Sequence, residues 1–142
     1  MTIKLRSHDL LKAVVEAREI SLADLEPLID SKFGDYRDYY SLAMLCTDGY
    51  IKCDWSSNGE PVTDELSLAS IFYASATGQQ SVNSFIASSA IDPERSKFFT
   101  APKGELYFAE ARAKRSDRIY AMAIGIVVGV CTAILAVQLG LK

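Results

Sequence analysis

The feature that most constrains this chain is a long stretch without charge near its C-terminal end. No charged residue occurs between Arg118 and Lys142, and the stretch from Ile119 to Leu141 holds 23 residues. As a helix, a segment of this length rises roughly 34 Å, which exceeds the hydrocarbon core of a bilayer at about 30 Å. We therefore predict a transmembrane helix at 119–141 that anchors the protein from its C-terminal end, since almost nothing follows it.

Basic residues crowd the N-terminal side of this segment, whereas Lys142 alone follows it. They form a basic collar that consists of Arg112, Lys114, Arg115 and Arg118. Positive charge beside a membrane helix is enriched on the cytoplasmic side, and basic side chains near anionic headgroups gain about 1 kcal/mol each. We expect the collar to contact lipid headgroups from a juxtamembrane helix at 105–118, with a domain at 1–104 in the cytoplasm.

The rest of the chain is acidic. Residues 1–111 contain 10 Lys and Arg residues against 17 Asp and Glu residues. Charged residues are spread through the first twenty residues, which lack the uninterrupted apolar core of a secretory signal. This agrees with a cytoplasmic domain. About 118 residues precede the apolar segment, enough for one domain with a modest core. Because phosphates repel an acidic surface, we do not expect nucleic acid as a partner.

Residue types that carry catalysis or bind metals are sparse and irregularly spaced. Cys46 and Cys53 lie in the domain, Cys131 lies in the apolar segment, and His8 is the single histidine. The cysteine spacing matches no common zinc motif, and a reducing cytoplasm argues against a structural disulfide. The apolar helical position of Cys46 favours a buried thiol over a nucleophile paired with His8. The sequence has no phosphate loop, HExxH or nucleophile elbow, so we predict no enzyme, cofactor or metal site.

Two helices are expected in the first thirty residues. The first begins at a cap on Ser7 or Asp9 and ends near Arg18 or Glu19, with apolar residues at helical spacing within it. The second is short and spans 22–29. Ser21 caps it, because its hydroxyl can accept a hydrogen bond from a backbone N–H of the first turn.

A third helix and a strand follow. Asp35 is a good cap for a helix at 36–47, and Gly49 stands where such a helix stops. Residues 50–55 then alternate apolar and polar side chains, which predicts a half-buried strand. A turn is expected at 56–59. The residues of the third helix expected to face inward are Tyr39, Leu42, Ala43 and Cys46.

Helical signals return after residue 62. Asp64 or Thr63 can start a helix that continues to Tyr73, and Gly78 is typical of its end. The apolar side chains within this segment are spaced to cover one face. We therefore predict a fourth helix at 64–73.

The pattern of residues 82–108, which lead to the apolar stretch, fits more than one secondary structure. Residues 82–86 mark a short helix, and Asp92 with Pro93 supplies a cap followed by proline at the first helical position. Two interpretations of 97–108 stay open: two short strands, or a helix that begins at Glu105 and runs unbroken into the membrane. The run EARAKRSD favours the helix beyond this point.

The order of helix, short helix, longer helix and strand over 7–56 resembles a winged-helix domain. In that family a helix followed by Asp-Gly-Tyr-Ile joins the third helix to the first wing strand, and Asp48 begins this run here. The resemblance implies a winged-helix fold. However, Arg37 is the only basic residue of the helix that would enter DNA, and the wing at 56–60 has none. We therefore expect a protein-binding version, or else a generic helical domain with a small β element.

Four tyrosines are candidates for a partner-binding surface, namely Tyr36, Tyr39, Tyr40 and Tyr50. Tyrosine combines an apolar ring with a polar hydroxyl, a combination that is enriched in protein interfaces. Ordinary core packing is the alternative for each of them. We predict that part of this set is exposed and contacts an unknown protein.

Small residues recur every four positions in the apolar segment, and we call Ala121, Gly125, Gly129 and Ala133 the small-residue row. Residues four apart share a helix face, and small side chains there let two helices approach closely in lipid. We expect the row to be an interface between copies of this chain. The opposite face, which includes Ile124 and Val127, suits acyl chains.

Together these features predict a mainly α chain: a small helical domain with a minor β element plus one C-terminal transmembrane helix. The leading hypothesis is a single-pass, tail-anchored membrane protein whose domain binds another protein and whose membrane helix forms a homo-oligomer. One alternative is a membrane-permeabilising effector of the toxin or abortive-infection type, although a single uncharged helix lines an aqueous pore poorly. Another is a membrane-tethered winged-helix transcription regulator.

Overall fold

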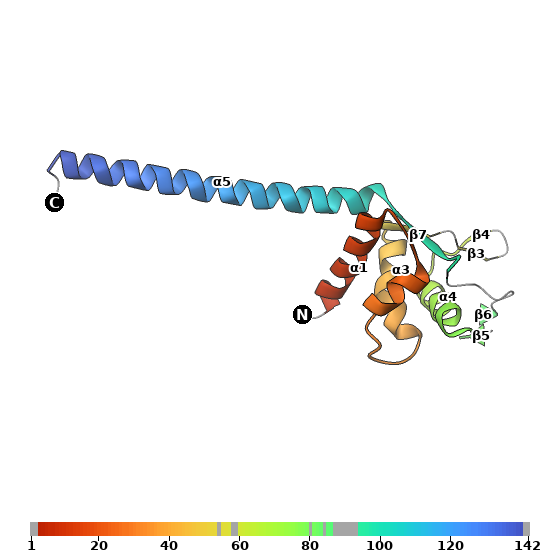
Figure 1. The fold of residues 1–142 in the computed structure, drawn as a ribbon. Coiled ribbons are helices and arrows are strands. Elements are labelled where there is room, and N and C mark those ends of the chain that lie inside the picture. The colour runs from red at the N-terminus through yellow and green to blue at the C-terminus, as the bar shows by residue number, and fades with distance from the viewer. Residues whose placement is uncertain are drawn as a thin grey trace. The chain divides into compact units, whose positions relative to one another are not determined.

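The computed structural model confirms the predicted fold class, which is mainly α with a minor β element and one long apolar helix. It describes residues 3–53, 55–57, 60–79, 81–83, 85–86 and 94–140. The chain divides into two compact units, Met1–Glu105 and Leu106–Lys142. The first unit is the domain, with helices around a small sheet, and the second is a single helical segment (Figure 1).

The N-terminal helix α1 spans Ile3–Ala17 and therefore begins earlier than the predicted caps at Ser7 and Asp9. Its end agrees with the prediction, because Arg18 has a φ of 63° and leaves the helical region. Leu10, Leu11 and Val14 are at most 3 % exposed and form the inward face of α1.

The second helical segment is split at its proline. Helix α2 spans Leu22–Leu25, and the 3-10 turn η1 spans Glu26–Leu28 with Pro27 inside it. The predicted cap is confirmed: the hydroxyl oxygen of Ser21 accepts from the backbone N–H of Asp24 at 3.2 Å and donates to the Asp24 carboxylate at 2.7 Å.

The third helical segment begins as the 3-10 helix η2 at Tyr36–Tyr39 and continues as α3 at Tyr40–Thr47. Asp35 caps it as expected, because its carboxylate accepts from the backbone N–H of Arg37 at 2.9 Å. Leu45 takes an inward position with 8 % exposure, whereas Cys46 is only half-buried. Cys46 therefore faces inward only in part, and Leu45, which was not among the residues expected to face inward, lies on the more deeply buried face.

Three strands form the main sheet in the order β1–β7–β2, with both pairs antiparallel. Strand β1 is Glu19–Ser21, β2 is Ile51–Cys53 and β7 is Lys97–Thr100. The strand after Gly49 was predicted, and KFFT was one of two open possibilities. No sequence pattern predicted β1, because its strand conformation depends on pairing with β7.

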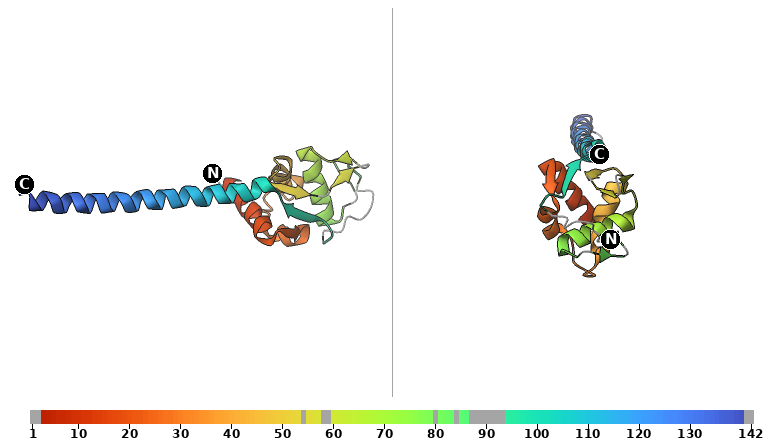
Figure 2. Two further views of the ribbon diagram at one scale, coloured as in Figure 1. Left: turned by 90° about the horizontal axis from the view of Figure 1, so that it is seen from above. Right: turned by 90° about the vertical axis from the view of Figure 1, so that its right-hand side faces the viewer.

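Helix α4 spans Glu65–Thr77 and is one turn longer than predicted. Asp64 caps it, with its carboxylate accepting from the N–H of Ser67 at 2.9 Å, and Gly78 ends it with a φ of 70°. Helix α4 packs against η2 and α3 (Figure 2).

Two short hairpins replace elements that were predicted differently. Ser56–Ser57 (β3) pairs with Glu60–Pro61 (β4), so the first half of the predicted turn is strand. Ser81–Val82 (β5) pairs with Phe85–Ile86 (β6), which corrects the predicted short helix at 82–86. Val82 before a tight reversal and Phe85 with Ile86 after it have a spacing that fits a helical pattern as well as a hairpin. The predicted turn residues 58–59 and the predicted cap at 92–93 lie outside the described residues.

Aromatic rings join the sheet to α4. Phe98 of β7 and Phe72 of α4 are both fully buried, and their ring centroids lie 5.3 Å apart in an edge-to-face arrangement. The Trp55 ring also packs edge-to-face against Phe72, with the ring centroids 5.6 Å apart. Such pairs stabilise beyond their buried area, so these rings form the centre of the core.

Helix α5 is continuous over Pro102–Gln138. It begins three residues before the predicted start at Glu105, with proline at its first position, where the missing N–H costs no hydrogen bond. The preferred interpretation of 97–108 is therefore confirmed for its helical part.

Candidate membrane helix and interaction surfaces

The first turn of α5 is held on the turn between α3 and β2. The ammonium group of Lys103 donates to the carbonyl oxygen of Asp48 at 2.7 Å and lies 4.3 Å from the centroid of the Tyr50 ring. The backbone N–H of Ala101 donates to the carbonyl of Tyr50 at 3.4 Å. Gly104 is buried in the same contact. The domain therefore fixes the start of the helix that leads to the apolar segment.

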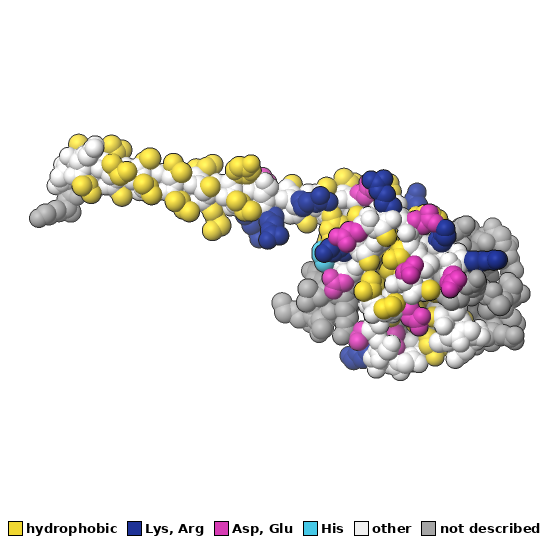
Figure 3. Space-filling model, in the orientation of Figure 1, with side chains coloured by type: hydrophobic (Ala, Val, Ile, Leu, Met, Phe, Trp, Pro, Cys, Tyr) yellow, Lys and Arg dark blue, Asp and Glu magenta, His cyan; other side chains and the backbone are white. Residues whose placement is uncertain are grey.

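The apolar part of α5 is long enough and apolar enough to cross a membrane. Within the described residues, the side chains of 119–140 are exposed except for that of Ala136, which is half-buried. Hydrophobic side chains cover this stretch in the space-filling view (Figure 3). A continuous apolar surface of this size is unfavourable in water and marks a contact with lipid or another apolar surface.

The small-residue row lies on the exposed surface of α5. A Cβ on Gly125 or Gly129 would meet no atom within 4 Å. The one polar hydroxyl nearby is satisfied within the helix, because Thr132 donates to the carbonyl oxygen of Val128 at 2.8 Å. The row therefore provides a shallow, apolar face that a second helix could approach closely.

The basic collar is exposed and partly shares the face of that row. At about 100° per residue, the row covers an arc of roughly 120°, and Lys114, Arg115 and Arg118 fall within the same arc. All four basic residues of the collar are exposed, as is Asp117. Two parallel copies that met through the row would thus bring like charges toward each other at the collar.

The four predicted tyrosines differ in environment. Tyr39 is 6 % exposed and packs edge-on against Tyr73 at 6.1 Å, so it belongs to the core and not to a partner surface. Burial, with the negative charges of Glu26 and Asp38, raises the pKa of Tyr39 to about 12. This burial agrees with the inward position expected for Tyr39 in the third helix and with core packing, the alternative to a partner surface.

Two of the remaining tyrosines form a pair. The rings of Tyr36 and Tyr40 lie 6.1 Å apart, and both side chains are half-buried. Tyr50 is also half-buried, but it contacts Lys103 at the start of α5. The candidate surface thus reduces to Tyr36 and Tyr40, one on η2 and one at the start of α3.

An exposed phenylalanine that the sequence analysis did not single out stands on the loop before η2. Phe33 is 51 % exposed, and the guanidinium of Arg37 lies 4.6 Å from its ring centroid. The Asp38 carboxylate accepts from the backbone N–H groups of Phe33 and Gly34, each at 2.8 Å. The loop is therefore ordered while its aromatic ring faces solvent. Its signal in the sequence was an aromatic residue inside a polar, glycine-containing loop.

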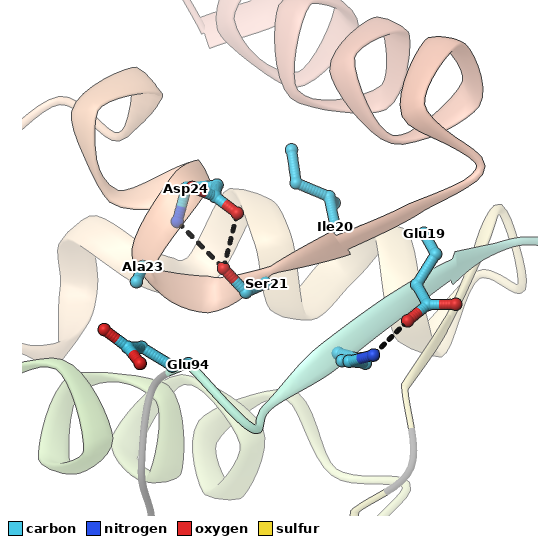
Figure 4. A pocket seen from close by; sticks show the side chains of 7 residues that line it. Glu19, Ile20, Ser21, Ala23, Asp24 and Glu94 are labelled. Carbon is cyan, nitrogen blue, oxygen red and sulfur yellow. Dashed lines mark hydrogen bonds and ion pairs between the residues drawn. The ribbon is translucent and has the colours of Figure 1, made fainter.

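An open pocket of about 430 Å³ gathers three carboxylates of the domain (Figure 4). Each interaction drawn there has a structural role: Lys97 of β7 forms an ion pair with Glu19 of β1, and Asp24 bonds to the capping residue Ser21. Glu94 completes the acidic lining and has interactions of its own. These contacts join two strands and cap a helix, so they account for the cluster without a ligand.

The described residues contain no group of three or more His, Cys, Asp or Glu side chains arranged to hold a metal ion. Comparisons with protein-family models, with curated proteins and with solved structures find no match to this chain. The case for function therefore depends on the chain's own geometry.

Proposed function

We propose that this chain is a single-pass membrane protein whose α5 crosses the bilayer, whose domain binds a protein partner in the cytoplasm, and whose membrane helix self-associates. The observation that carries the proposal is the exposed, uncharged surface of α5 beyond Arg118. Exposure of this apolar surface to water is strongly unfavourable, whereas in a bilayer lipid tails cover it.

The basic collar supports the cytoplasmic placement of the domain. Its four basic residues are exposed on the helix immediately before the apolar stretch. Basic residues there are retained on the cytoplasmic side and are attracted to its anionic headgroups. The collar thus both orients the helix and holds it at the membrane surface.

The loop and helix that precede α4 support binding of a protein. Phe33 is exposed on an ordered loop, so a partner could bury its ring without first ordering the backbone. The half-buried pair Tyr36 and Tyr40 offers aromatic surface on the adjoining helix. Aromatic and arginine side chains carry much of the binding energy in protein interfaces, and Arg37 lies against the Phe33 ring.

The same region argues against DNA binding in the manner of a winged helix. Arg37 is the only basic residue of the η2–α3 segment, and its guanidinium is engaged with the Asp35 carboxylate at 2.6 Å. Contacts to phosphates and base edges need free basic side chains. The helices α1, α2 and α3 precede β2, with the unpredicted strand β1 between α1 and α2. A protein-binding variant of that fold remains our proposal for the domain.

Self-association of the membrane helix converts weak contacts into avid binding, because two linked domains engage a partner surface at high effective concentration. The test is a membrane two-hybrid assay on the full chain. Gly125→Leu with Gly129→Leu should abolish the signal by separating the helices. The matched control, Ala123→Leu with Val127→Leu, adds bulk with the same spacing on the opposite face and should preserve it. Equal signals from the two double variants would refute the proposed interface.

Orientation and permeability are tested on the same full chain reconstituted in liposomes. Protease added outside should remove the domain only in the population whose domain faces outward, with a protected fragment that contains α5. Retention of an encapsulated dye at all protein densities is expected for an anchor. Dye release that scales with protein density would instead support the membrane-permeabilising effector.

A further inference from the structure

Cys46 and Cys53 meet where α3 gives way to β2. Cys46 lies in the last turn of α3, and Cys53 is the last residue of β2. Their side chains share a hydrogen bond, and both are free thiols with half-buried side chains. The fold therefore places two thiols of different elements beside each other, which is the first requirement for a disulfide between them.

Both cysteines line one pocket of about 590 Å³. Lys52 and Lys103 line the same pocket, and the described lining residues include no Asp or Glu. Thr47 and Thr63 add hydroxyl groups to the wall. The Glu65 carboxylate accepts from the Thr47 hydroxyl at 3.4 Å, so one acidic group lies at the wall. Two lysines on a lining that itself contains no Asp or Glu still favour a small anionic molecule, so the pocket can bring an anionic reagent to the thiols.

We propose that Cys46 and Cys53 form a reversible, intramolecular disulfide in exchange with an anionic low-molecular-weight disulfide of the glutathione class, which binds at this pocket. Disulfides in a reducing compartment are typically transient and redox-sensing. This role is compatible with the sequence-based expectation that the pair is not a permanent structural disulfide. It adds a modification site to the domain that the proposed membrane and partner functions do not require.

The exchange proceeds in two balanced steps. The Cys53 thiolate attacks one sulfur of the small disulfide, which forms a mixed disulfide and releases one small thiolate that takes up a proton. Cys46 then loses its proton to solvent and attacks the Cys53 sulfur, which releases the second small thiol. Two protein thiols are oxidised to one disulfide, and one small disulfide is reduced to two thiols.

The order of these steps follows from the environment of Cys46. Its hydrogen bond with Cys53, together with burial, raises the pKa of Cys46. A thiol that holds its proton is the poorer first nucleophile, so Cys53 attacks first and Cys46 resolves the mixed disulfide. The finished bond closes a short loop around Asp48 and Tyr50, the two residues that receive the start of α5.

The test uses the full chain in detergent micelles, with Cys131→Ala so that a bond between membrane helices cannot contribute. The protein is equilibrated in buffers of reduced and oxidised glutathione, alkylated and digested, and the Cys46–Cys53 cross-linked peptide is quantified by mass spectrometry. The same measurement is made in denaturing urea. We expect the disulfide equilibrium constant of the folded chain to exceed that of the unfolded chain by about tenfold or more, because the fold holds the thiols together.

Two single variants complete the experiment. Cys46→Ser should stop the exchange at a mixed glutathione disulfide on Cys53, whereas Cys53→Ser should slow adduct formation on Cys46. Lys52→Gln with Lys103→Gln should slow oxidation by glutathione disulfide more than oxidation by a neutral disulfide. An equilibrium constant that is equal or smaller in the folded chain would overturn the proposal. If the lysine variant slows oxidation by both disulfides equally, the proposal that the reagent is anionic is wrong.

Discussion

Gly104 lies so close to the carbonyl oxygen of Tyr50 that a Cβ on residue 104 would be 2.6 Å from that oxygen. The same Cβ would be 3.3 Å from the Cδ1 atom of Leu11. Because the nearer atom belongs to the backbone, it cannot move aside as a flexible side chain would. The first turn of α5 can therefore dock on the α3–β2 turn without a shift of the backbone only when residue 104 is glycine.

Gly104→Ala should consequently destabilise the domain, although alanine favours helices over glycine by nearly 1 kcal/mol. Overpacking of this kind typically costs about 1–3 kcal/mol, and the clash should outweigh the gain in helix propensity. The measurement is chemical denaturation of the full chain in detergent, monitored by tryptophan fluorescence from Trp55.

Gly125→Ala is the matched control, because the same substitution on α5 meets no atom within 4 Å. It should leave the denaturation midpoint of the domain unchanged. If Gly104→Ala is as stable as this control, the start of α5 is not held against Tyr50 in solution.

The two phenylalanines of β7 should differ sharply in their contribution to stability. Phe98 is fully buried against Phe72, whereas Phe99 is 37 % exposed on the other side of the strand. Phe98→Ala should lower the free energy of unfolding by about 3–5 kcal/mol, the usual cost of removing a buried aromatic ring. Phe99→Ala should cost much less. Thermal unfolding followed by circular dichroism compares the two variants. Similar losses of stability from both would contradict the assignment of Phe98 to the buried face of β7 and of Phe99 to the exposed face.

The cap of α4 should make stability depend on pH in the acid range. The Ser67 hydroxyl and the backbone N–H of Ser67 lower the pKa of the Asp64 carboxyl below its ordinary value of 3.8. Since the unfolded chain then binds the proton more readily, the contribution of Asp64 is complete above 3.8 and is lost as the pH falls through the lowered folded-state value.

Asp64→Asn tests this linkage, because asparagine is also a good N-cap but does not titrate. We expect the variant to retain most of the stability at neutral pH and to show a shallower loss of stability under acid, measured by urea denaturation at a series of pH values. The residual slope should include Asp35, whose pKa is lowered by Arg37. An unchanged slope would mean that the Asp64 carboxylate does not titrate with folding.

Association of the membrane helices should depend on lipid charge. The small-residue row and most of the basic collar share a helix face, so pairing through the row brings the two collars close together. In a neutral bilayer no lipid charge offsets the repulsion between them. Anionic lipids would screen this repulsion. We expect energy transfer between labelled copies to rise on the order of threefold when about a third of a neutral lipid is replaced by an anionic one.

Lys114→Gln with Arg118→Gln serves as the comparison for that experiment. Removing these charges should strengthen association in neutral bilayers and make it nearly independent of lipid charge. Weaker association in anionic bilayers than in neutral ones would show that the collar does not oppose pairing.

The elements that could be predicted are those fixed by local chemistry. Ser21, Asp35 and Asp64 each cap the helix assigned to them, because a short polar side chain bonds to backbone N–H groups within three residues. Gly78 ends α4 in the left-handed conformation that glycine adopts without strain. These signals involve neighbours in the sequence, so they can be recognised before the fold is known.

The incorrect or incomplete predictions concern segments whose sequence pattern fits more than one structure. Residues 82–86 have apolar spacing compatible with a short helix, but they form the hairpin β5–β6. Tyr39 was expected to face inward and was also a candidate for the partner surface, and its packing against Tyr73 of α4 agrees with the inward position. Phe33 attracted no attention, because only the hydrogen bonds to Asp38 show that its loop is ordered.

The sequence by itself determined the apolar segment, its basic collar and the spacing of the small-residue row, because hydropathy, charge and helical period depend on composition and order alone. Only the tertiary structure decided that β1 pairs with β7, that Cys46 meets Cys53 and that Gly104 lies against Tyr50. Each of these contacts joins residues from different elements. Their proximity depends on how the whole core packs, which no local pattern encodes.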